Sequence, residues 1–359
     1  MSSSIRPRRK KAKFLTFLSL VFFLGGLVWW LSRNEVKPWE KSAATVVEKL
    51  RFHEQQALMG TTVQITVYAE DEEIAQAAMK KAFLRGEMIN QIASDYLPDS
   101  ELSRFNRSPV EEWFEASSDF VMMVGYAVEL AEQTEGAFDP TLGTATHLWR
   151  ETKKSGVLPA NEVLQAALEA SGWQKIEVDF DQSRVRRLAE GLRLDLGGLA
   201  KGYAADQMLA SLQSSGLPQS LVVIGGDVRC GLAPPNAAGW VVGLRGEKGE
   251  IAGTISVSEC AVSTSGDLEQ FVVIDSRRYS HIIDSKTGLG LTDSLMATVV
   301  AENGLMADPL ATAACVDPLF FRDLPGATKI HSRILSGGMK QVSDSFPAVT
   351  PLLAGEEPQ

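Results

Sequence analysis

The chain has 359 residues, of which 45% are hydrophobic and 22% charged, a balance typical of a globular protein with an ample core. Its formal net charge is −10, although six basic residues lie within the first 13 positions, so the rest of the chain is strongly acidic. Nucleic-acid binding needs a basic surface, and this composition therefore excludes it as the main function. The cysteines, Cys230, Cys260 and Cys315, are odd in number and form no C-x-x-C, which argues against a disulfide framework.

Residues 14–31 form an uncharged apolar run, FLTFLSLVFFLGGLVWWL, just long enough to span a bilayer. The run ends in a tryptophan pair typical of a membrane interface, and the basic residues 1–13 before it predict a cytoplasmic N-terminal tail. We therefore expect a single-pass anchor in the inner membrane, with the catalytic domain on the periplasmic side. A cleaved signal peptide is the alternative.

Hydrophobic periodicity predicts helices in the first half of the chain and mostly strands in the second half. This pattern indicates an α+β fold with mixed or antiparallel sheets flanked by helices, built as one catalytic unit or two lobes over residues 57–340. A polar linker (32–56) precedes that unit and a polar tail (341–359) follows it. The expected helices cover 72–92, 120–131, 161–171 (opened by an Asn cap), 199–214 and 305–316; the expected strands cover 61–68, two or three segments of 175–195, and 220–224, 240–244, 251–257, 271–275, 279–284 and 296–301.

The stretch Leu194-Asp195-Leu196-Gly197-Gly198-Leu199-Ala200-Lys201 predicts a short strand, a tight turn and a helix that starts at once. Two glycines let the backbone approach a ligand, and the helix start offers unpaired N–H groups and partial positive charge. Lys201 adds a full charge in the first turn, so the segment suits a phosphate or pyrophosphate. The spacing fits neither a Walker loop nor G-x-G-x-x-G, and a plain tight connection is the alternative.

Asp308 and Thr312 are spaced so that both side chains face the same side of a helix. A carboxylate and a hydroxyl together form half of a site for a hard cation such as Mg²⁺. Pro309 suits the first turn of a helix, so Asp308 acting as an N-cap is the alternative.

A strand and turn over 279–288 bring together His281, Asp284 and Lys286. His281 is a candidate acid or base, and its alternative is a hydrogen-bonded structural role. In the loop 136–143, Asp139 precedes a proline and is held extended, and Phe138 could cover a flat ring or simply end in the core.

Taken in order, these segments resemble the ApbE-type FAD:protein FMN transferases over almost all of residues 57–316. The matching stretches are Ala57-Leu58-Met59-Gly60-Thr61, Pro98-Asp99-Ser100-Glu101-Leu102-Ser103-Arg104-Phe105-Asn106, Gly136-Ala137-Phe138-Asp139-Pro140-Thr141 with Leu148-Trp149, the run from Leu194 to Asp206, Gly225-Gly226-Asp227-Val228, Ser263-Thr264-Ser265-Gly266-Asp267, Ser280-His281-Ile282-Ile283-Asp284 and Ala307-Asp308-Pro309-Leu310-Ala311-Thr312-Ala313. Two positions depart from the family pattern: Ser285 stands where proline is frequent, and Pro309 where alanine is frequent.

The resemblance implies an enzyme that binds FAD and Mg²⁺, moves FMN through its phosphate onto a Thr or Ser of an acceptor flavoprotein, and releases AMP. It implies a metal site at Gly198, Asp308 and Thr312. His281 is our candidate for the base that accepts the acceptor hydroxyl's proton, with Asp284 as the second candidate. The implied FAD contacts are Met59, Tyr96, Ala137, Phe138, Asp139, Asp195, Lys201, His281 and Ile282.

Acceptors in such a family are subunits of membrane redox complexes, either sodium-pumping quinone reductases or complexes of the Rnf type. Two other functions would use the same residues. An FAD pyrophosphatase would produce FMN and AMP with water as the acceptor. A non-catalytic flavin-binding protein would need the FAD contacts but not the metal pair.

Overall fold

The computed structural model describes residues 48–267, 270–320 and 330–351. Lys49–Gln359 form one compact unit. The basic tail 1–13 and the predicted anchor 14–31 lie outside the described residues. Among the residues that are described, no helix is both long and apolar enough to cross a membrane.

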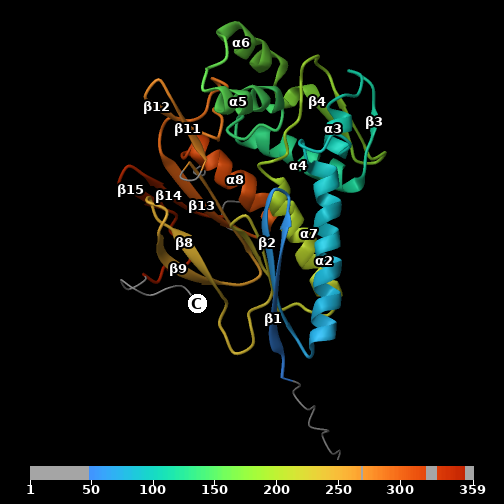
Figure 1. The fold of residues 1–359 in the computed structure, drawn as a ribbon, viewed down its shortest axis with the longest axis vertical. Helices are drawn as coiled ribbons and strands as arrows, with labels where there is room; N and C mark the ends of the chain where they lie inside the picture. The colour runs from blue at the N-terminus through green and yellow to red at the C-terminus, as the bar shows by residue number, and fades with distance from the viewer. Residues whose placement is uncertain (1–47, 268–269, 321–329, 352–359) are drawn as a thin grey trace, which may run out of the picture. The chain divides into compact units, whose positions relative to one another are not determined.

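An antiparallel sheet of eight strands forms the centre of the unit, in the order β1-β2-β6-β7-β10-β13-β14-β15 (Figure 1). Burial alternates along β6, as expected for a strand that faces two different layers. The eight strands are β1 Leu50–Leu58, β2 Thr61–Ala69, β6 Ser220–Ile224, β7 Asp227–Cys230, β10 Ala261–Gly266, β13 Leu295–Ala301, β14 His331–Ser336 and β15 Met339–Val342.

One face of this sheet is covered by three helices, α2 (Glu72–Ala93), α7 (Ala200–Ser214) and α8 (Gly304–Val316). The hairpin of β8 (Trp240–Arg245) and β9 (Ile251–Val257) packs on the other face through Trp240, Val242 and neighbouring apolar residues. The sheet therefore has a separate core on each face. Residues next to one another on a strand divide between them: Val299 belongs to the helix-side core and Val300 to the hairpin-side core.

The remaining elements lie around one end of the sheet, in the upper part of Figure 1. Asn106 joins this region to the segment before α7: its side chain donates to the Leu194 carbonyl at 2.9 Å and accepts from the Leu194 N–H at 2.8 Å. These elements are α3 Glu101–Phe105, β3 Phe114–Glu115, α4 Ser118–Gln133, α5 Gly143–Ser155, α6 Asn161–Ala170, a 3₁₀ turn Trp173–Lys175, β4 Ile176–Asp179, β5 Arg184–Arg187, β11 Phe271–Ile274 and β12 Arg277–Ser280.

Several predicted boundaries need correction. The linker predicted over 32–56 ends earlier, because β1 starts at Leu50 and pairs along its length with β2. The tail predicted over 341–359 is partly structured: Thr350 pairs with Thr254, and Phe346 is buried. Asn161 is the first helical residue of α6 rather than its cap.

Two of the predicted strands are also corrected. The last strand of the hairpin at 271–280 ends at Ser280 instead of continuing to residue 284. The segment 194–196 is not a ladder strand, because Asn106 and the Pro140 carbonyl take up its backbone groups instead of a neighbouring strand.

Candidate active site

Helices α7 and α8 cross at a point where neither carries a side chain. A Cβ atom added to Gly202 would lie 2.0 Å from the carbonyl oxygen of Gly304, and one added to Gly304 would lie 2.3 Å from the carbonyl oxygen of Gly202. Only glycine permits so close an approach. The crossing brings the first turn of α7 directly against Asp308 of α8, whose carboxylate accepts from the Gly202 N–H at 3.0 Å.

Asp308 is not the N-cap of α8. The helix begins at Gly304, and Asn303 caps it by accepting from the Met306 N–H at 3.0 Å. The carboxylate of Asp206, from α7, satisfies the two preceding amides at 2.9 and 2.8 Å. Pro309 accordingly lies inside the helix instead of in its first turn. The Asp308 side chain therefore does not act as a cap and faces the first turn of α7.

Lys201 joins two carboxylates at this crossing. Its Nζ lies 3.2 Å from Asp308 Oδ1 and forms an ion pair with Asp227, which comes from the start of β7. The Asp308 and Asp227 side chains are only 3% and 9% exposed. Two carboxylates and one ammonium carry a formal charge of −1, so the charge of Lys201 is paired within the cluster. The net negative charge of this cluster attracts a cation.

Burial raises the pKa of the Asp308 carboxyl to about 6, and the negative charge of Asp227 acts in the same direction against the opposing charge of Lys201. A cavity of about 10 Å³, enough for roughly one water molecule, lies behind the two carboxylates and is also lined by Gly202 and Ser263. The Asp308 carboxylate is therefore an ionisable oxygen ligand that is almost fully shielded from water.

Strand β10 supplies hydroxyl groups to the same site. Ser263 donates to the Asp227 carboxylate, and Ser265 Oγ lies 3.2 Å from Thr312 Oγ1. The turn before α7 also approaches Thr312, because a Cβ on Gly198 would lie 3.8 Å from Thr312 Oγ1. Gly198 therefore lies beside Thr312, one turn of α8 from Asp308, and the three residues offer oxygen atoms of the kind that suits a hard cation.

In the part of the chain that the structure describes, no group of three or more His, Cys, Asp and Glu side chains is placed to hold a metal ion. A cation at this position would thus depend on the hydroxyl of Thr312 and the carbonyl of Gly198 as well as on Asp308. The residues present fit Mg²⁺, which uses few protein ligands and retains water or phosphate oxygens.

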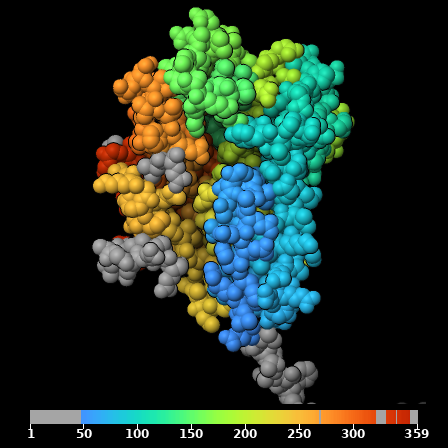
Figure 2. Space-filling model, in the orientation of Figure 1, coloured from blue at the N-terminus to red at the C-terminus, as the bar shows by residue number. Residues whose placement is uncertain are grey.

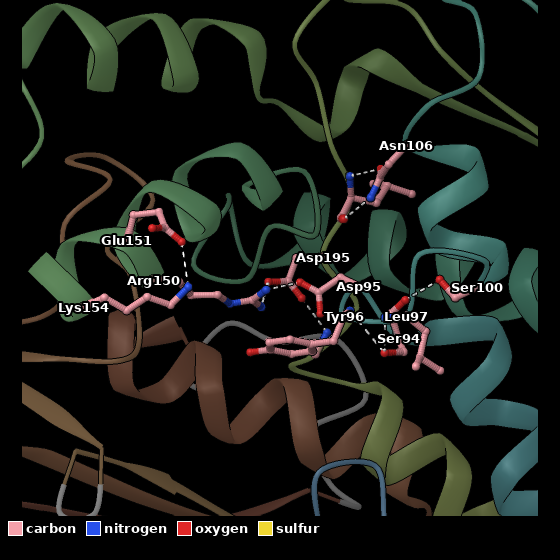
Figure 3. Close-up of polar contacts among 12 residues, drawn as sticks. Ser94, Asp95, Tyr96, Leu97, Ser100, Asn106, Arg150, Glu151, Lys154 and Asp195 are labelled. Carbon is pink, nitrogen blue, oxygen red and sulfur yellow. Dashed lines mark hydrogen bonds and ion pairs between the residues drawn. The ribbon is translucent and has the colours of Figure 1, made fainter.

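A second polar group is centred on Arg150 of α5 (Figure 3). Its guanidinium pairs with Asp95 and, at 3.1 Å, with Asp195 Oδ2, while its Cζ lies 4.6 Å from the centre of the Tyr96 ring. Burial and the charge of Asp95 raise the pKa of Asp195, and Arg150 opposes the rise. Arg150 therefore ties the loop that carries Tyr96, a side chain 75% exposed, to the segment that leads into Gly198.

Two tight turns lie side by side at this end of the sheet. Met59-Gly60 joins β1 to β2 and Gly225-Gly226 joins β6 to β7, and all four residues have positive φ. The Gly225 N–H donates to the Thr62 carbonyl at 3.1 Å, so the two turns are in contact. For Met59, with φ of 54°, this conformation carries a cost that glycine would avoid.

A groove of about 580 Å³ follows the tip of the β1–β2 hairpin, including Met59, and is bounded by Glu87 and Asn90 of α2. Figure 2 shows this hairpin in blue beside α2, which is drawn in cyan. Of the predicted FAD contacts, Tyr96 is exposed, and Met59 is half-buried like most of the others.

His281 and Asp284 follow β12. The His281 ring is half-buried, with Nδ1 3.2 Å from the Gln270 carbonyl oxygen. Burial lowers its pKa, and the charges of Lys153 and Lys201 act in the same direction. Asp284, in contrast, is engaged in its own turn, where its carboxylate accepts from the Lys286 N–H at 2.8 Å and the Thr287 hydroxyl at 3.2 Å. The turn is closed despite the serine at position 285.

Phe138 and Ile282 are the two predicted contacts with buried side chains. Phe138 is 6% exposed and packs in the main core against Gly198, so the core alternative describes its side chain. Ala137 is half-buried. Asp139 accepts from the Thr141 N–H and hydroxyl at 2.8 and 2.6 Å, and burial raises its pKa. The Ile282 side chain belongs to a separate small core.

Residues missed by the sequence reasoning make up much of this site. They are Asp227, Ser263, Ser265, Asp206, Arg150 and Asp95. Four of them lie in stretches already singled out as polar or Gly-rich, so their presence was visible but their partners were not. Asp267, in the same β10 stretch as Ser263, pairs with Arg278 at 3.0 Å and holds the β11–β12 hairpin.

The sequence and the fold are similar to those of known proteins. The model of the ApbE family matches residues 59–319. A relative from Vibrio cholerae named FAD:protein FMN transferase is 31% identical over 266 residues, which cover 72% of this chain and 79% of that protein. The solved ApbE protein from Thermotoga maritima superposes with a TM-score of 0.73 at 31% identity, covering 83% of this chain and 98% of the other. The flavin transferase ApbE from Vibrio cholerae gives a TM-score of 0.73 at 28% identity, with the same coverage. The chain therefore belongs to the ApbE family.

Proposed function

We propose that this protein transfers FMN from FAD onto a Thr or Ser hydroxyl of an acceptor flavoprotein, with release of AMP and in dependence on Mg²⁺. The observation that carries the proposal is the convergence of Lys201, Asp227 and Asp308 with Thr312 and the Gly198 turn at one helix crossing. This set of oxygen ligands suits a divalent cation next to a pyrophosphate, and the relatives carry the name of this activity.

Each residue has a distinct part in the proposed reaction. Asp308, Thr312 and the carbonyl of Gly198 would hold Mg²⁺. Burial works against the charge of Lys201, but Asp227 and Asp308 raise its pKa, so that it stays an ammonium beside them. The chemistry supplied by the bound ion is polarisation of the pyrophosphate and stabilisation of the departing AMP. The chain itself contributes mainly positioning and charge stabilisation, which dominate phosphoryl transfer.

His281 is the proposed base. Its lowered pKa keeps the ring neutral near pH 7. Nδ1 faces the Gln270 carbonyl and therefore carries the proton, which leaves Nε2 free to accept the proton of the acceptor hydroxyl. Asp284 is less suited to this role, because local donors already occupy both of its oxygens.

The proposed flavin contacts are Met59, Tyr96, Ala137, Phe138, Asp139, Asp195, Lys201, His281 and Ile282. Exposure favours a side-chain contact from Tyr96, and Arg150 would orient Tyr96 from below its ring.

The test is to incubate the full-length protein in detergent with FAD, Mg²⁺ and a flavin-acceptor domain of a membrane redox complex. We expect the acceptor's mass to rise by one FMN and its band to become fluorescent. Asp308→Asn should abolish the signal, and Asp119→Asn, which removes a carboxylate of α4 that accepts from the Tyr203 hydroxyl of α7, should retain it. An acceptor of unchanged mass, with folded wild-type enzyme, would reject the proposal.

The same experiment without acceptor separates the two alternative functions. Steady AMP release with free FMN would show a contribution from FAD hydrolysis. FAD that stays intact with Mg²⁺ and every acceptor tested would favour a non-catalytic flavin-binding protein. The Asp308 and Thr312 pair argues against that last function, since flavin binding alone does not need it.

We further propose that residues 14–31 tether the protein to the inner membrane with the catalytic unit on the periplasmic side, where acceptors in sodium-pumping quinone reductases or Rnf-type complexes would meet it. The support is the apolar run and the basic residues before it. Protease added to spheroplasts should degrade the catalytic unit, and full protection would place it in the cytoplasm. A soluble, shortened product would mean that the run is a cleaved signal.

A further inference from the structure

Two of the three cysteines lie opposite each other on neighbouring strands. In the β7–β10 ladder, Val228 is paired with Val262 and Arg229 with Ala261. The next pair in this register is Cys230 and Cys260, and the Cys230 N–H donates to the Cys260 carbonyl at 2.8 Å. Cys260 directly precedes β10, and residues directly opposed in an antiparallel pair have Cα atoms about 4.5–5.5 Å apart and side chains on the same face. That separation falls within the range that a disulfide spans.

The surroundings of the two thiols differ in a way that suits exchange chemistry. Cys230 is fully buried, and Cys260 is half-buried at the edge of the hairpin-side core. The hydrogen bond between the thiols raises the pKa of Cys230 and lowers the pKa of Cys260. The guanidinium of Arg229 donates to the backbone carbonyls of both cysteines at 2.8 and 3.2 Å, which places a positive charge beside them. Cys260 is thus the more reactive and the more accessible thiol.

We propose that Cys230 and Cys260 are a redox-active pair that forms an intrachain disulfide by exchange with a disulfide oxidant, either a small-molecule disulfide or that of an oxidoreductase. The Cys260 thiolate attacks one sulfur of the oxidant and displaces its other half as a thiolate. The Cys230 sulfur then attacks Cys260, forms the intrachain bond and releases the second half. Two electrons pass to the oxidant, and the protons of the two protein thiols end on the two thiols released.

This bond would fix the pairing register of β7 and β10. The same ladder, followed three residues toward the site, places Asp227 opposite Ser263, whose hydroxyl donates to the Asp227 carboxylate. Asp227 and Ser263 point to the helix side of the sheet, and the cysteines point to the hairpin side. A disulfide would therefore fix the alignment of the two strands that carry Asp227 and Ser263 without occupying the site. The inference is independent of the proposed reaction.

The test counts thiols in the denatured full-length protein before and after equilibration with glutathione disulfide. The reduced protein has three free thiols, and we expect one to remain after oxidation, with peptide mapping showing the Cys230–Cys260 cross-link. Cys315→Ala is the matched control, because Cys315 is buried in α8 with its pKa raised to about 12; this variant should fall from two thiols to none. Cys260→Ser should keep both remaining thiols.

Thermal unfolding provides a second, independent readout. A disulfide that closes a loop of this size should raise Tm by about 5 °C in the wild type and in Cys315→Ala, and should leave Tm of Cys260→Ser unchanged. Three thiols that persist, a stable glutathione adduct without the cross-link, or a cross-link that involves Cys315 would each overturn the proposal. A cross-link without a rise in Tm would show that the bond does not fix the native register.

Discussion

Replacing Asp308 with asparagine should separate the stability of this protein from its activity. The carboxylate is 3% exposed, shares its surroundings with Asp227, and titrates at about 6 where an ordinary aspartate titrates at 3.8. Keeping it ionised at neutral pH therefore costs the folded state about 3 kcal/mol, at 1.36 kcal/mol for each pH unit. The asparagine side chain would carry no charge and could still accept from the Gly202 N–H.

The sign of this effect with pH follows from the raised pKa. The folded state binds the Asp308 proton more tightly than the unfolded state, so wild-type stability decreases as pH rises from about 4 to about 6. The Asp308→Asn variant lacks this decrease. In the absence of divalent cations we expect it to be more stable than wild type by up to 3 kcal/mol at pH 8, and the advantage should disappear near pH 4.

Urea unfolding of both proteins in EDTA, at several pH values from 4 to 8, measures the difference directly. Added Mg²⁺ should then stabilise the wild type and not the variant, because only the wild type has the complete ligand set. Asp119→Asn is a control in which the change in stability should have the opposite sign. Burial works against the charged form of Asp119, but hydrogen bonds from Arg85 and Tyr203 lower its pKa. Loss of this carboxylate should therefore destabilise the fold by about 1–3 kcal/mol at neutral pH. An Asp308→Asn protein that is less stable than wild type at pH 8, with an unchanged response to Mg²⁺, would show that this carboxylate neither destabilises the fold nor binds the ion.

Four further predictions concern single side chains. Thr312→Val should reduce Mg²⁺-dependent turnover less than Asp308→Asn does, because a neutral hydroxyl contributes less than a carboxylate; an equal loss in a Mg²⁺ titration would contradict this. His281→Gln should lower the transfer rate about 10²- to 10⁴-fold and remove the acid limb of the pH–rate profile, which in the wild type should lie below the usual histidine range because the pKa is lowered. Arg150→Lys should weaken FAD binding about tenfold in calorimetric titration, since one ammonium cannot pair with Asp95 and Asp195 and stack on Tyr96 as the planar guanidinium does; an unchanged affinity would remove it from the site. Gly202→Ala should destabilise the fold by about 2–4 kcal/mol in urea unfolding, because its methyl group would lie 2.0 Å from the Gly304 carbonyl oxygen, and a near-neutral result would mean that the helices can separate.

The elements themselves were largely predictable because their signals are local. Helix α7 and helix α8 begin within one residue of the predicted positions, and strands 220–224 and 251–257 have the predicted bounds. The periodicity of apolar residues and the position of glycines determine such segments over a few neighbours. Where the local signal was ambiguous, as for Asp308 before a proline, the structure excludes the cap alternative, because Asn303 provides the cap.

The composition of the site was not predictable in the same way. Asp227 meets Lys201 and Ser263 only because β7 pairs with β10 and packs under α7, and pairing register is a property of segments far apart in the chain. The same holds for Arg150 with Asp195, and for Cys230 with Cys260, whose spacing in sequence suggests no relationship. The two carboxylates that pair with Lys201 could not be predicted for the same reason, since they come from other elements.

The backbone contact between α7 and α8 also gives the protein an intrinsic spectroscopic reporter. The amide proton of Gly202 is bonded to the Asp308 carboxylate at 3.0 Å, and glycine amides resonate in a sparsely populated region of a nitrogen–proton correlation spectrum. Its chemical shift should follow the ionisation of Asp308 as pH passes through about 6, and its exchange with solvent should slow when a cation fixes that carboxylate. A single resonance from a residue that takes no part in the chemistry would then record the occupancy of the site.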